Sequence, residues 1–187
     1  MKDEMKTIEA GPYTLVARLN RGVFRGALWS SGKIIRQIEG DSLDDVWNKL
    51  QTFVANEFEH QVAARAGAEP TAKEACSAFL RIERKLSAGH KAMLRAHLRA
   101  DGNNITATQL AVAAGYNGYS AANLQYGLLG AMLFAETPQV IPRRTDNSPI
   151  MTCVIARQGD QHMTGEGQWV WKMRTYIVEG LTAADIL

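Results

Sequence analysis

The chain has 187 residues, with 21 lysines and arginines against 19 aspartates and glutamates, and 46% of its residues are hydrophobic. This composition is typical of one or two folded domains and excludes a disordered tail. No stretch approaches the roughly 18 apolar residues of a membrane span, and the charged N-terminus lacks the apolar region of a signal peptide. Cys76 and Cys153 are too few for a disulfide scaffold. We therefore expect a cytoplasmic protein with reduced thiols.

The net charge of +2 hides an uneven distribution. Six basic residues and one acid, Glu83, lie between Arg81 and Arg99, whereas residues 102–135 contain no charged side chain. Such a stretch is either buried or presents an uncharged polar surface. An alanine-rich linker at 63–70 predicts two modules, residues 1–65 and 66–187.

The first module alternates apolar and polar residues over 12–38, which predicts three antiparallel strands joined by turns at 20–22 and 30–32. Ser42 is a good N-cap for a helix that would cover the sheet. The segment Glu39–Val46 resembles the strand-to-helix junction of HicB-type antitoxins, which implies a scaffold or dimerisation sheet. Alternatively, four arginines could form a sheet that faces nucleic acid: Arg18, Arg21, Arg25 and Arg36.

The second module begins with helices. Thr71 and Glu74 have the spacing of a capping box, which predicts a helix to about Leu86. Ser87 can cap a second helix that continues to Ala100. Three basic residues at i, i+4 and i+8 form one stripe along this second helix, which itself contains no acid: Lys91, Arg95 and Arg99.

A helix-turn-helix pattern follows. Thr106 and Gln109 form a capping box for a short helix that Gly115 ends, and Ser120 would cap a longer helix to about Phe134. A strand over Ile150–Ala156, a loop from Gln158 to Gly167 and a returning strand over 168–174 complete the layout of a winged helix. The overall prediction is an α+β fold with a β-hairpin wing.

A second resemblance covers about 110 residues. The segment Gly115–Gly127, with the pattern GYxxYxAxNLxYG, and the downstream Trp169–Arg174 are similar to a bacterial family of uncharacterised proteins. Related segments accompany restriction-type HNH endonucleases. The resemblance implies a mobile-element or defence setting, although no HNH-type metal motif is present in this sequence.

These patterns predict non-enzymatic, sequence-selective binding of double-stranded DNA, and they leave open whether the chain binds as a homodimer. Asn and Gln are natural readers of adenine, tyrosines can stack on a splayed base, and cations contact phosphates. The predicted contact residues come from the helical pair, the connector and the wing: Lys91, Arg95, Arg99, Tyr116, Asn117, Tyr119, Ser120, Asn123, Gln125, Arg143, Arg144, Arg157 and Lys172.

Other hypotheses remain open. The helix after residue 119 contains no cation and would suit a protein interface, and Gly127 and Gly130 would admit a close partner helix. The runner-up is therefore a protein-binding inhibitor or adaptor, for example of a host defence protein. An enzyme with a dispersed site is a third hypothesis. His90 and His97 are too far apart for the i, i+4 pair of a helical zinc site, and we expect no catalytic residue, metal or cofactor.

Overall fold

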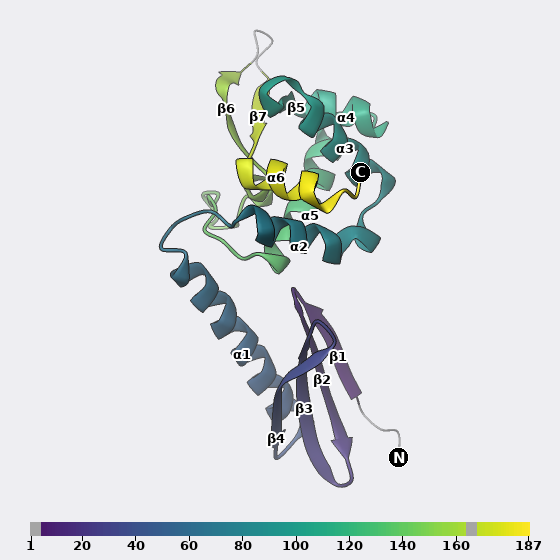
Figure 1. Cartoon of the computed structure of the whole chain (residues 1–187), viewed down its shortest axis with the longest axis vertical. Coiled ribbons are helices and arrows are strands. Elements are labelled where there is room, and N and C mark those ends of the chain that lie inside the picture. The colour runs from purple at the N-terminus through teal and green to yellow at the C-terminus, as the bar shows by residue number, and fades with distance from the viewer. Residues whose placement is uncertain (1–4, 164–167) are drawn as a thin grey trace. The chain divides into compact units, whose positions relative to one another are not determined.

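The computed structural model describes residues 5–163 and 168–187, and of residues 160–163 it describes only the backbone. The chain divides into two compact units, one ending at Gly67 and the other beginning at Ala68 (Figure 1). Strands dominate the first unit and helices the second, so the α+β prediction is confirmed.

The first unit is a four-stranded antiparallel meander, β1-β2-β3-β4, with one long helix, α1, on one face (Figure 1). The three predicted strands are present, and a fourth, β1, precedes them. The sequence did not reveal β1 because it is an edge strand whose side chains are mostly exposed, so that it lacks clear alternation. The elements are β1 (Met5–Ala10), β2 (Tyr13–Asn20), β3 (Val23–Ser30), β4 (Lys33–Gly40) and α1 (Leu43–Ala64).

Alternation decides which face of this sheet is buried. Leu15, Ala17 and Leu28 point to α1 and are buried against its apolar stripe, which includes Val46 and Leu50. The predicted N-cap of α1 is confirmed, because the Ser42 hydroxyl accepts a hydrogen bond from the Asp45 N–H at 3.0 Å. The opposite face of the sheet is left without a covering helix in this unit.

The second unit starts with four helices and one short strand. The capping boxes predicted at Thr71 and Thr106 are both formed, and Ser87 caps the second helix through an analogous box with His90. The first helix ends at Ile82 rather than at Leu86, and a 3-10 turn follows it. The elements are α2 (Ala72–Ile82), η1 (Glu83–Lys85), α3 (Ala88–Arg99), η2 (Asp101–Asn103), β5 (Asn104–Thr106), α4 (Ala107–Ala114) and α5 (Tyr119–Glu136).

The end of the chain completes a second sheet, in the order β5-β7-β6. The hairpin strands β6 and β7 are antiparallel, and β5 pairs with β7. Of the predicted wing loop, residues 158–163 belong to strand β6, and 164–167 lie outside the described residues. The elements are η3 (Met151–Val154), β6 (Ala156–Met163), β7 (Trp169–Met173) and α6 (Thr175–Ala184).

The prediction of a strand over Ile150–Ala156 is wrong, because Met151–Val154 form a 3-10 helix, η3. This segment packs on α5 at Gly130, where an added Cβ would lie only 2.1 Å from the Met151 carbonyl oxygen. The Cys153 carbonyl accepts a hydrogen bond from Arg174 Nε at 2.6 Å. Backbone groups that serve these contacts are not available to a β-ladder. The glycine on α5 therefore accommodates this chain's own backbone, not the partner helix that the sequence suggested.

Candidate nucleic-acid interface

The turn between α4 and α5 presents a short polar surface. Gly115 ends α4 in the left-handed conformation, at φ 70°, as its position predicts. Helix α5 begins at Tyr119, with Gly118 at the N-cap, so the prediction that Ser120 caps this helix is wrong. Four of the predicted contact residues here are exposed, which leaves their side chains accessible to a ligand: Asn117, Tyr119, Ser120 and Asn123.

Tyr116 differs from its neighbours in this turn. It is half-buried against the core, and its hydroxyl lies where a Cβ on Gly89 would be, at 2.1 Å. Gly89 therefore makes room for this ring at the start of α3. Tyr116 packs the turn onto α3, so it is a weaker candidate for base stacking than the exposed Tyr119.

Gln125 is partly withdrawn from the surface by a histidine. His90 Nδ1 accepts the Ser87 N–H at 3.3 Å, so Nε2 carries the proton. His90 Nε2–H then donates to the Gln125 Oε1 at 3.2 Å. Half-buried and bonded in this way, Gln125 joins α5 to α3, and it is a weaker candidate for reading bases than the exposed Asn123.

His97 is the fully buried centre of a larger network. Its Nε2–H donates to two carbonyl oxygens, of Asn103 at 3.0 Å and Trp171 at 3.1 Å, while the Tyr126 hydroxyl donates to Nδ1 at 2.6 Å. Burial lowers the pKa of His97 to about 4, so the ring is neutral at pH 7. Burial also raises the pKa of the Tyr126 hydroxyl. One side chain thus fixes α5 and the hairpin sheet relative to α3.

The basic stripe on α3 is not uniform. Lys91 Nζ lies 3.6 Å from the carboxylate of Glu83, which belongs to the 3-10 turn before the helix and partly neutralises the stripe. Arg95 is half-buried, and Arg99 is exposed at the end of the helix. Arg99 is therefore the most accessible cation of the three.

The connector arginines are both exposed but are tied to their own loop. Arg143 Nη1 donates to the Asn147 carbonyl at 2.9 Å, and Arg144 Nη1 donates to the Pro149 carbonyl at 3.2 Å. These hydrogen bonds close the loop between α5 and η3, and they give both guanidinium groups a structural role.

Two cations meet on the hairpin sheet. Arg157 in β6 and Asn104 in β5 are both the register partners of Lys172 in β7, so the three side chains lie in one row on the face opposite Ile105 and Met173. A phosphate can contact two cations that lie side by side in this way. The structure thus places Arg157 beside Lys172, which the sequence alone did not predict.

The uncharged stretch is only partly buried, and it exposes apolar side chains that its sequence pattern did not predict. Val112 on α4 is 76% exposed, and Leu124 and Leu128 on α5 are 62% and 48% exposed. Leu124 and Leu128 are four residues apart and therefore lie on one face of α5. The sequence signal that could have indicated this exposed apolar face is that neither of the two positions carries a polar residue.

Within the described residues, no cluster of three or more His, Cys, Asp or Glu side chains could hold a metal ion. None of the described helices is long and apolar enough to cross a bilayer. Cys153 is buried, which raises the pKa of its thiol, and Cys76 is half-buried. No protein-family model matches the chain, and no curated protein or solved structure is significantly similar to it.

Proposed function

We propose that the second unit binds double-stranded DNA without catalysing a reaction, with α5 as the helix that enters the major groove. The observation that carries this proposal is the start of α5, directly after a tight glycine turn, where Tyr119, Ser120 and Asn123 expose polar side chains. In a helix-turn-helix the first residues of the second helix are the ones that reach base edges.

The order of elements supports the same function. From α3 to β7 the chain forms a helix, a short strand, two helices joined by a turn, a connector that contains η3, and a hairpin, with β5 added to the edge of the hairpin. This order resembles that of a winged helix-turn-helix, in which the hairpin would be the wing. Arg157 and Lys172 on the hairpin and Arg99 at the end of α3 would supply phosphate contacts.

Titration of a labelled duplex across a salt series tests the proposal. Affinity should fall steeply with salt, and Arg99→Ala should reduce the slope of log K against log salt by about 0.9. Lys73→Ala removes an exposed cation on α2 and should leave the slope unchanged. Duplex binding that is absent at low salt would rule out the function.

Asn123→Ala should act on specificity rather than on the salt slope. Loss of a base-edge contact should reduce discrimination between the preferred and a mismatched duplex by about 1 to 3 kcal/mol. A uniform loss of affinity on every sequence would instead assign Asn123 to the phosphate backbone. The selected sequence itself would come from binding to a randomised duplex pool.

The exposed Val112, Leu124 and Leu128 favour a second candidate function. Apolar, uncharged surfaces are typical of the centre of a protein interface. The partner would be a second copy of the chain or a host protein, as in an inhibitor or adaptor that acts between a mobile element and its host in the cytoplasm. Leu124→Asp with Leu128→Asp should abolish a nuclease-resistant complex in lysate or a dimer in sedimentation, and unchanged assembly contradicts this candidate.

A further inference from the structure

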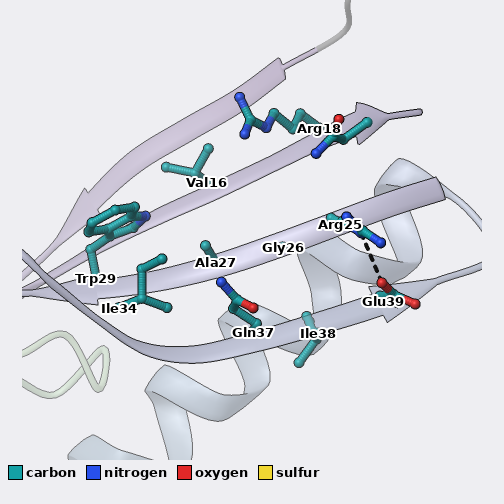
Figure 2. Close-up of a pocket in the computed structure, with 11 residues that line it drawn as sticks. Val16, Arg18, Arg25, Gly26, Ala27, Trp29, Ile34, Gln37, Ile38 and Glu39 are labelled. Carbon is teal, nitrogen blue, oxygen red and sulfur yellow. Dashed lines mark hydrogen bonds and ion pairs between the residues drawn. The ribbon is translucent and has the colours of Figure 1, made fainter. Parts of the chain in front are cut away.

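The uncovered face of the first sheet contains a hollow of about 730 Å³, within the size range of pockets that hold organic ligands (Figure 2). Trp29 and Ile34 lie at one end, Arg25 and Glu39 at the other, and Val16 and Ala27 between them. The side chains in the middle of the hollow, Val16 and Ala27, are small, so a planar group can lie flat against the sheet there.

The charged end of this hollow is built from a pair of like charges. Arg18 in β2 is the register partner of Arg25 in β3, and both are exposed. Arg25 donates from Nε to Glu39 Oε1 at 2.9 Å, which leaves its two terminal nitrogens available. Arg18 has no carboxylate partner among the described residues. Two neighbouring arginines, with one acid on the side of Arg25 away from Arg18, attract an anion.

The other end of the hollow offers an aromatic surface. Trp29 is half-buried and Ile34 is 42% exposed, so the indole is accessible on the sheet face. Arg25 and Trp29 are four residues apart on one strand, about 13 Å along it. The amides of Asn20 and Gln37 also line the hollow and can exchange hydrogen bonds with polar base edges.

We propose that this face binds single-stranded nucleic acid, with a base stacked on Trp29 and a phosphate between Arg18 and Arg25. Stacking on an aromatic side chain in a basic groove is how proteins hold single strands. In a duplex the faces of the bases are covered by neighbouring pairs and cannot reach Trp29. Successive units of one strand can occupy both ends of the hollow at once. This site is distinct from the duplex surface proposed for α5.

Fluorescence anisotropy of the full chain with a labelled oligothymidylate tests the proposal. Trp29→Ala should weaken binding about 5- to 100-fold, and Trp29→Phe should restore most of the affinity because it keeps an aromatic ring. Trp169→Ala, which removes an exposed tryptophan in the second unit, should bind as the unchanged protein does. Circular dichroism verifies that each variant is folded.

Arg18→Ala should reduce the salt slope of oligothymidylate binding by about 0.7, as expected for one phosphate contact on a single strand. Lys33→Ala, at an exposed cation outside the hollow, should not change the slope. Equal affinity of the Trp29→Ala variant overturns the proposal. So does full competition by an equal concentration of thymidine monophosphate or of unlabelled duplex. Because the probe is a single strand, failure here leaves the duplex function of α5 standing, and the reverse also holds.

Discussion

The two units have hydrophobic cores that differ in how many polar side chains they bury. Among residues 5–67, the first buries only apolar side chains and Tyr13, and Leu15, Leu28 and Leu50 pack together in its core. The second buries six polar or charged residues among those described, His90, His97, Thr106, Glu136, Thr137 and Gln139. Burial of apolar groups is non-directional, whereas a buried polar group must meet a partner at a defined distance. The first core tolerates change of shape poorly, and the second tolerates change of chemistry poorly.

The sharpest test of this contrast is His97→Leu. The substitution keeps the volume but leaves the Asn103 and Trp171 carbonyls and the Tyr126 hydroxyl without their partner. Each buried polar group left unpaired costs about 1 to 3 kcal/mol, so the second unit should lose about 4 kcal/mol of unfolding free energy. Hydrogen exchange of amides in each unit measures this separately. His60→Leu at an exposed site in α1 is the matched control, and an equal effect there would break the comparison.

The next largest expected difference between the two units is in how acid changes their unfolding free energy. The pKa of His97 is about 4 in the folded chain and about 6.5 unfolded, so the folded state holds the ring neutral. Its contribution is complete above pH 6.5 and is lost as the pH falls to 4, by about 3 kcal/mol, with no further loss below. Urea unfolding at a series of pH values measures this slope. The His97→Leu variant should lack it, and a variant that keeps the full slope would assign the effect to another group.

The ion pair between Arg81 on α2 and Glu136 at the end of α5 is a smaller test. Glu136 is 5% exposed and Arg81 is 38% exposed, so Arg81→Ala leaves a buried carboxylate without its cation. Because water reaches this site in part, we expect a loss of about 2 kcal/mol, below the range for fully buried pairs. Arg84→Ala, an exposed neighbour, should be neutral in thermal unfolding. If both variants melt alike, the pair does not stabilise the second unit.

The smallest effect concerns shape in the first unit. A Cβ at Gly26 would lie 2.5 Å from Val46 Cγ1 and 3.0 Å from Leu50 Cδ1, so Gly26→Ala should overpack the sheet against α1. We expect a cost of about 1 to 2 kcal/mol in the first unit. Gly118→Ala is the control, since nothing lies within 4 Å and its φ of 178° suits any residue. A neutral Gly26→Ala would show that α1 can shift outward.

Part of the candidate interface could be predicted from sequence. Thr106 and Gln109, the αL glycine at 115 and the exposed Asn123 follow from capping rules and helical periodicity, because both act within a few residues. The hydrogen bond between Gln125 and His90 joins residues 35 positions apart, and no local sequence pattern indicates it. The pairing of Arg157 with Lys172 depended on the register of a hairpin whose first strand was predicted in the wrong place.

The sequence by itself determined the α+β class, the boundary between a strand-rich and a helix-rich half, and most helix starts, since these depend on period and on caps. Alternation over 12–38 also predicted the strands β2, β3 and β4. Only the tertiary structure decided that Met151–Val154 pack as a 3-10 helix on Gly130, that His97 holds three elements together, and that Arg18, Arg25 and Trp29 share one hollow. These depend on contacts between distant segments, where the need to satisfy buried polar groups and fill space outweighs local preference.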